Sequence, residues 1–133
     1  MSDQPFPTED MALTTILVVN DMTRARHFYE KILGARIYRE YEGSTVLDFN
    51  GNWLLLVVGG GPTEDKPDVH FAPPADPNRV HQAFTIRVKD CMAAYETLKN
   101  RGATFLTPPV DHGYEIRAFF RDPDGHLFEI SQA

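Results

Sequence analysis

The sequence is poor in cysteine, in basic charge and in long apolar runs. Its single cysteine, Cys91, excludes an internal disulfide. The longest apolar run, residues 53–58, is far shorter than the roughly 20 residues that a membrane-spanning helix needs. Residues 1–10 contain no basic stretch followed by an apolar one, so we expect no secretory signal. A reducing cytoplasm is the compartment that fits these absences.

Acidic residues outnumber basic ones, 19 against 13, which gives a net charge of −6. We expect no nucleic-acid partner, because phosphate binding requires clustered Lys and Arg. We expect no membrane partner either, since an acidic surface repels anionic lipid headgroups. A length of 133 residues with 42% hydrophobic residues is typical of one globular domain with a substantial core.

Residues 11–58 follow a pattern of one strand, one helix and three strands, after a polar segment with two prolines (residues 1–10) that we predict to be a disordered tail. Residues 12–20 are mostly apolar and β-branched, as in a buried strand. Asp21 is a suitable N-cap for a helix over residues 22–33, which Gly34 would end. Turn residues then separate three further predicted strands, residues 36–41, 44–49 and 53–58.

Residues 80–133 repeat this pattern. A strand is predicted over residues 82–88, Asp90 is the N-cap of a helix over residues 91–101, and Gly102 ends that helix. Three more strands are expected at residues 104–106, 114–120 and 127–131. The linker between the two modules, residues 59–79, is rich in Gly and Pro, which disfavour both helix and central strand. The sequence therefore predicts one α+β domain of two βαβββ modules that form a curved mixed sheet with a concave trough.

Two strings of residues point to a known family. Residues 19–34 read Val-Asn-Asp-Met-x-x-Ala-x-x-Phe-Tyr-x-x-x-Leu-Gly, and residues 119–130 read Phe-Phe-Arg-Asp-Pro-Asp-Gly-His-Leu-Phe-Glu-Ile. In this order and spacing they resemble the first helix and the closing hairpin of the vicinal-oxygen-chelate superfamily. That superfamily includes glyoxalases, bleomycin-resistance proteins and extradiol dioxygenases. The resemblance covers residues 12–132 and implies the duplicated fold, but it does not choose among these functions.

The resemblance also implies a divalent metal, held in the trough by His and Glu from four strands. Of the four corresponding positions in this chain, the first is Thr14, its counterpart in the second module is Ala83, and residues 53–58 offer only apolar side chains. Only the fourth position, Glu129, carries a side chain that can ligate the metal. Thr and Ala do not replace imidazole for these metals, so we expect no metal cofactor. The alternative is a rearranged metal site built from His81, His112 and Glu129.

Strand parity predicts which side chains face the trough together with Glu129. A four-residue turn in the closing hairpin would place Ile116, Ala118 and Phe120 on that face, and a five-residue turn would place Glu115, Arg117 and Phe119 there. We favour the five-residue turn, because the thiol transferases of the resembling superfamily use the position of Phe119 to line their cavity. We predict that Arg117 and Glu129 pair, either to bind a polar group of a ligand or as a structural ion pair. The full set of candidate ligand-binding residues is Thr14, Ile16, Trp53, Ala83, Thr85, Arg87, His112, Arg117, Phe119 and Glu129.

The leading hypothesis is a homodimeric protein that binds a small organic molecule in the trough without a metal, as a sequestering or resistance factor. A second hypothesis is a metal-dependent lyase or dioxygenase that uses the rearranged site. A third is a structural or regulatory dimer with a vestigial trough. Two-sided apolar strands are the reason to expect a dimer. The linker, residues 59–79, is predicted to be a flap over the trough.

Overall fold

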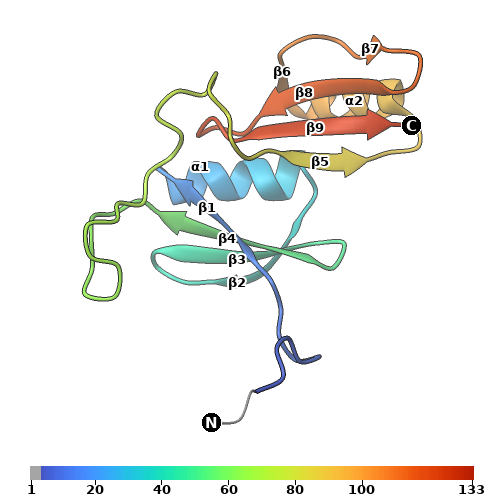
Figure 1. The fold of residues 1–133 in the computed structure, drawn as a ribbon. Helices are drawn as coiled ribbons and strands as arrows, with labels where there is room; N and C mark the ends of the chain where they lie inside the picture. Colours follow the sequence, from blue (N-terminus) through green and yellow to red (C-terminus); the bar gives the residue numbers. More distant parts are fainter. Residues whose placement is uncertain (1–3) are drawn as a thin grey trace.

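A computed structural model describes residues 4–133 and divides them into two modules of the same design (Figure 1). The first module contains helix α1 (Met22–His27), which continues as the π-helical segment η1 (Phe28–Ile32). Its four strands form a sheet in the order β1-β4-β3-β2. Their bounds are β1 Thr15–Val19, β2 Arg36–Glu40, β3 Ser44–Phe49 and β4 Asn52–Val58.

The second module contains helix α2 (Cys91–Arg101) and a sheet in the order β5-β9-β8-β6, with β7 also paired to β8. The first strand of each module runs parallel to the last, β1 beside β4 and β5 beside β9. The predicted α+β class and the duplicated βαβββ unit are therefore confirmed, and the short β7 lies where the sequence predicted a loop. The strands are β5 Phe84–Arg87, β6 Thr104–Phe105, β7 Val110–Asp111, β8 Ile116–Arg121 and β9 Leu127–Gln132.

The helix boundaries follow from local chemistry. Asp21 and Asp90 are the N-caps, and each side chain accepts a hydrogen bond from a backbone N–H in the first turn, at 3.1 and 3.0 Å. Gly102 ends α2 with a φ of 111°, a left-handed conformation that favours glycine. The first helix ends in a wider π-helical turn before Gly34, which also has a positive φ.

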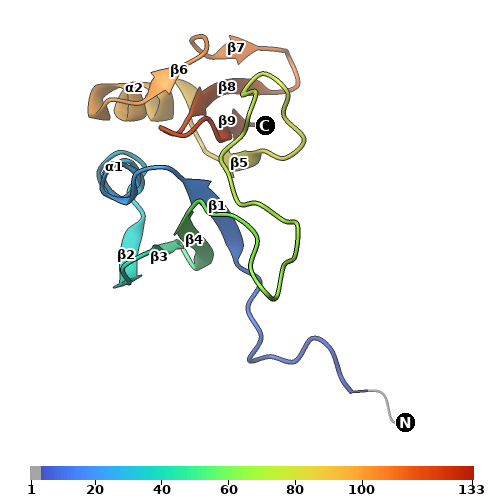
Figure 2. The same ribbon diagram turned by 90° about the vertical axis from the view of Figure 1, so that its left-hand side faces the viewer.

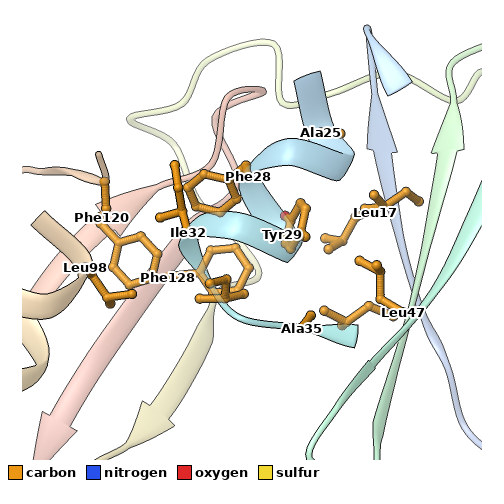
Figure 3. Close-up of a cluster of buried hydrophobic side chains, with 14 of the residues drawn as sticks. Leu17, Ala25, Phe28, Tyr29, Ile32, Ala35, Leu47, Leu98, Phe120 and Phe128 are labelled. Atoms are coloured by element: carbon orange, nitrogen blue, oxygen red, sulfur yellow. The ribbon is translucent and has the colours of Figure 1, made fainter. Parts of the chain in front are cut away.

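The hydrophobic core surrounds α1, which lies between the two sheets (Figures 1 and 3). The ring of Phe28 lies 6.4 Å from that of Phe120, and the ring of Tyr29 lies 6.0 Å from that of Phe128. Tyr29 also points towards Leu17 of the first sheet (Figure 3). Both modules therefore share one core, and neither buries its apolar helix face alone.

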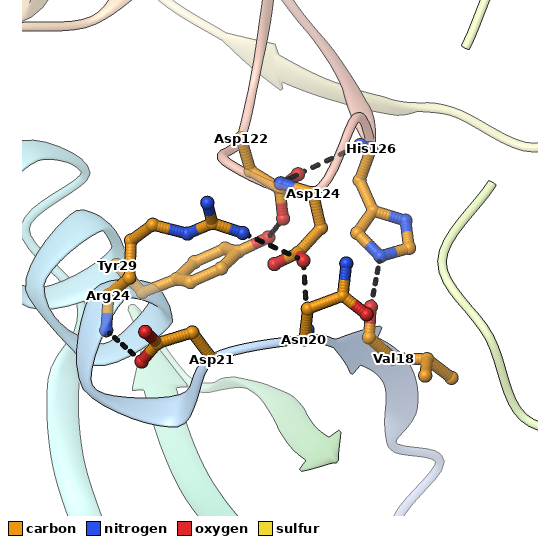
Figure 4. A network of polar contacts seen from close by, with 8 residues as sticks. All are labelled: Val18, Asn20, Asp21, Arg24, Tyr29, Asp122, Asp124 and His126. Carbon is orange, nitrogen blue, oxygen red and sulfur yellow. Dashed lines mark hydrogen bonds and ion pairs between the residues drawn. The ribbon is translucent and has the colours of Figure 1, made fainter. Parts of the chain in front are cut away.

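Polar contacts join the turn between β8 and β9 to the start of α1 (Figure 4). The buried carboxylate of Asp124 accepts hydrogen bonds from the Asn20 amide at 2.9 Å and from the Arg24 guanidinium at 3.2 Å. The ring of His126 donates from Nε2 to the carbonyl of Val18 at 2.8 Å. The Asp-Pro-Asp-Gly string thus supplies a turn, as predicted, and also connects the two modules.

The strands form two separate mixed sheets, and within residues 4–133 no strand of one pairs with a strand of the other. This differs from the expected single curved sheet, because α1 lies between the sheets and each sheet keeps one face turned away from the helices. We call these the outer faces. The outer face of the first sheet is apolar. We call it the apolar outer face, and it consists of five cross-strand neighbours: Ile16, Val18, Val46, Leu55 and Val57.

The segments outside the modules have little regular structure. The linker, residues 59–79, holds only two isolated bridges, between Gly60 and Phe71 and between Thr63 and Lys66. Of the predicted tail, residues 1–3 lie outside the described residues, and residues 4–10 are exposed and belong to no helix or strand. No helix among the described residues is long and apolar enough to cross a membrane.

Candidate functional site: a polar sheet face beside an inter-module cleft

The outer face of the second sheet carries polar side chains in two cross-strand rows. The turn between β8 and β9 has five residues, 122–126, as predicted, and it places Phe119 opposite Glu129. On the other side of Glu129, the parallel strand β5 places Thr85 beside it. The second row is Arg87, Ser131 and Arg117. The predicted face of Glu129 is therefore the observed one.

The predicted ion pair between Arg117 and Glu129 is wrong. Arg117 Nη1 lies 3.1 Å from Glu115 Oε1, two residues away on the same face of the strand. Glu129 instead accepts a hydrogen bond from the Thr85 hydroxyl at 2.6 Å. The reason is register, since Thr85 lies directly beside Glu129 whereas Arg117 is only its diagonal neighbour.

Of the two carboxylates on this face, Glu115 accepts more side-chain hydrogen bonds than Glu129. The hydroxyl of Ser131 donates to one of its oxygens, and Arg117 donates to the other. The Ser131 hydrogen bond, followed by those of Arg117 and the positive charges of Arg117 and Arg87, lowers the pKa of Glu115 below its ordinary value. Both charges of the Arg117–Glu115 pair are thereby neutralised locally.

A cleft of about 1030 Å³ lies between the modules. We call it the inter-module cleft. Four of the candidate residues line it, namely Trp53 from the first module and Ala83, Thr85 and Arg87 from the second. Thr85 joins the cleft to Glu129 on the polar face. The other lining residues are mostly apolar or small: Ala12, Leu13, Thr15, Leu33, Phe49, Asn50, Gly51, Asn52, Leu54, Phe84, Ile86, Val88 and Phe128.

The remaining candidates are dispersed. Ile16 and His81 line a second, smaller cleft of about 470 Å³, whose wall includes linker residues such as Pro74. Thr14 is half-buried just before β1, and exposed His112 lies beyond β7 with its ring 6.0 Å from that of Tyr114. The structure therefore gathers most of the candidates in the inter-module cleft and on the adjoining polar face, whereas Thr14, Ile16 and His112 lie apart from them.

The residues present do not fit the metal that the family resemblance implies. Thr14 and Ala83 carry no imidazole or carboxylate, and β4 contributes none either. Within residues 4–133, no three His, Cys, Asp or Glu side chains lie close enough together to hold a metal ion. The alternative set of His81, His112 and Glu129 is not assembled in the chain, since His81 borders the smaller cleft and Glu129 is engaged by Thr85.

The fold is a duplicated βαβββ unit with two mixed sheets, one of which keeps an open polar face. The sequence profile of the Glyoxalase/Bleomycin resistance protein/Dioxygenase superfamily matches residues 12–130. The chain belongs to this superfamily.

Two relatives with described activities are similar along most of their length. The chain is 27% identical to a lactoylglutathione lyase of Neisseria meningitidis, over 90% of this chain and 88% of the relative. It is 30% identical to the metallothiol transferase FosB of Lysinibacillus sphaericus, over 84% of this chain and 74% of the relative.

Solved structures of the superfamily share the fold at lower identity. A glyoxalase/bleomycin resistance protein/dioxygenase from Alicyclobacillus acidocaldarius has a TM-score of 0.70 at 19% identity, covering 95% of this chain and 93% of that one. The fosfomycin resistance protein FosX from Listeria monocytogenes has a TM-score of 0.70 at 18% identity, covering 95% of each chain.

Sequence reasoning missed the apolar part of the inter-module cleft. Leu33 directly follows the first helix, Leu54 belongs to β4 and Phe128 to β9, and none of them was among the candidate residues. No local signal distinguishes them, because they border open space only where the two modules meet.

Proposed function

We propose that this chain binds a small organic molecule without a metal, in the inter-module cleft and on the adjoining polar face. The observation that carries the proposal is the absence of ligating side chains at Thr14 and Ala83, together with the open cleft that Ala83 lines. Its volume of about 1030 Å³ is at the upper end of the range of roughly 300–1,000 Å³ usual for ligand sites.

The side chains of the site favour ligand binding over catalysis. Glu129 accepts a hydrogen bond from Thr85, and Glu115 is held by Ser131 and Arg117. Buried Cys91 lies outside this site, and burial, with nearby acidic charges, raises the pKa of its thiol, so it is a poor nucleophile. A fixed polar face beside an apolar cleft selects and retains a molecule, which is what a sequestering or resistance factor requires.

We propose further that the protein is a homodimer in which a second copy covers the apolar outer face. Ile16 is 47% exposed, and its neighbours Val18, Leu55 and Val57 are only partly buried. A contiguous apolar sheet face of this kind favours association. A second copy is the occupant we favour, because its polar outer face would complete a site with one apolar and one polar wall.

The absence of a functional metal is tested by purification without chelator, followed by elemental analysis and thermal denaturation with added nickel, zinc, manganese or iron(II). We expect substoichiometric metal and an unchanged melting temperature. The Glu129→Gln variant serves as the matched control, since it removes the one retained ligand and should give the same result. Near-unit occupancy that this variant abolishes would overturn the proposal and favour a metal-dependent lyase or dioxygenase.

A further inference from the structure

The inter-module cleft has an unusual charge distribution for an acidic protein. Among its lining residues, all of which lie in the described part of the chain, Arg87 is the one charged side chain. The whole chain carries a net charge of −6, yet no carboxylate lines this cleft. The cleft therefore offers one positive charge in an otherwise apolar or neutral surface.

Arg87 is available to a ligand. It is exposed on β5, and within residues 4–133 it forms no ion pair. Its nearest cross-strand neighbour is Ser131, whose hydroxyl donates to Glu115. Because Arg117 already occupies the other oxygen of Glu115, the guanidinium of Arg87 keeps donors for a further acceptor.

The rest of the cleft lining is mostly apolar. Leu33, Leu54 and Phe128 border the cleft although each is less than a tenth exposed. Together with the half-buried Trp53 and Phe84 they give the cleft an apolar surface, against which an apolar molecule would gain free energy by leaving water. A neutral molecule over Arg87 would desolvate the guanidinium without compensation, and a cation would be repelled by it.

We propose that the ligand of this cleft is an apolar molecule with a single negative head group, such as an aromatic or aliphatic carboxylate or sulfonate, and that Arg87 binds the head group. This inference rests on the proposed function and names its ligand class. The head group pairs with the guanidinium through charge-assisted hydrogen bonds. The apolar body lies towards Leu54 and Phe128.

Two dyes with the same aromatic skeleton test the proposal. Anilinonaphthalene sulfonate is an anion, and phenylnaphthylamine is its uncharged counterpart. Trp53 is the only tryptophan of the chain and lines the cleft, so energy transfer from Trp53 to each dye reports binding near this site. Titrations use the intact protein, its Arg87→Met and Arg87→Lys variants, and Arg39→Met as the control, since Arg39 is an exposed arginine on β2 that does not line the cleft. Circular dichroism and melting temperatures verify that each variant is folded.

We expect one sulfonate dye to bind per chain. Arg87→Met should raise its dissociation constant about tenfold, which is the effect expected for the loss of one charge-assisted contact in a hydrated cleft. Arg87→Lys should restore part of the affinity, and Arg39→Met and the uncharged dye should show no change. Equal binding of both dyes, unaffected by Arg87→Met, would overturn the anionic ligand class and leave the proposed binding function intact. The absence of energy transfer to either dye would instead overturn binding in this cleft altogether.

Discussion

Tyr29 is a fully buried residue whose polar end reaches the other module. Its hydroxyl donates to Asp122 Oδ2 at 2.5 Å, while the other oxygen of Asp122 accepts from the amides of Asp124 and His126 (Figure 4). Burial raises the pKa of Asp122, against the effect of these hydrogen bonds. The contact joins the first helix to the β8–β9 turn, so its loss should lower the stability of both modules.

We expect Tyr29→Phe to lower the free energy of unfolding by about 1–3 kcal/mol, because it leaves a buried carboxylate oxygen without its donor. Chemical denaturation monitored by circular dichroism measures this change. Tyr114→Phe is the matched control, since Tyr114 is 75% exposed, and its unfolding free energy should stay within error of the parent protein. Equal stabilities of the two variants would contradict the structural role of the Tyr29–Asp122 contact.

The alkaline limit of stability should depend on Tyr29. Burial, followed by the charge of Asp122, raises the pKa of Tyr29 well above its ordinary value. In the unfolded chain Tyr29 releases its proton at about pH 10, whereas in the folded chain it stays protonated at that pH. The contribution of Tyr29 to the free energy of unfolding is therefore complete below that pH and is lost as the pH rises towards the pKa of the folded state. Ultraviolet titration should show one tyrosine that ionises only when the protein unfolds. In Tyr29→Phe this late phase should be missing, and its persistence would contradict the assignment.

At the scale of elements, we expect the linker to be the segment most susceptible to proteolysis. Gly60 and Phe71 exchange two backbone hydrogen bonds, at 2.9 and 2.8 Å, whereas residues 72–79 contain no strand or helix and border the smaller cleft. The Arg121 guanidinium donates to the Pro77 carbonyl and to the Asn78 side chain, so we propose that residues 72–76 are the mobile part of the flap. Arg79 is exposed at the end of the linker, and the backbone of exposed loops is cut first by proteases.

We expect limited trypsin digestion to cleave first after Arg79 and to produce two fragments that remain associated. They should stay together because the modules share the core around α1 and the contacts of the β8–β9 turn. Mass spectrometry identifies the fragments, and gel filtration tests their association. Arg79→Gln is the control and should slow the first cut. Initial cleavage elsewhere, or separation of the fragments, would contradict this description of the linker.

At the scale of the whole molecule, the apolar outer face predicts the state of assembly. Ile16→Glu places a charge on this face and should convert the proposed dimer into a monomer. Leu106→Glu is the matched control, because Leu106 has nearly the same exposure, 49% against 47%, but follows β6 in the second module. Sedimentation velocity at micromolar concentration distinguishes the two states. A parent protein that sediments as a monomer would overturn the dimer.

Much of the fold was predictable because its signals are local. Asp21 and Asp90 cap their helices, Gly102 adopts the left-handed conformation, and residues 44–49 form β3 with the predicted bounds. The five-residue turn before β9 was favoured over a four-residue turn on the family resemblance, and its length sets which side chains share a face with Glu129. Each of these features depends on a few neighbouring residues and the backbone.

The sequence by itself determined the duplicated modules and the absence of a metal-ligating side chain at Thr14 and Ala83, and it narrowed the neighbours of Glu129 to two sets. Only the tertiary structure decided that the sheets stay separate, that Arg117 pairs with Glu115, and that Trp53 and Arg87 line one cleft. The physical reason is that a strand pattern specifies which face a side chain occupies. Its partner, however, depends on the strand that packs alongside, and the cleft depends on how α1 holds two modules apart.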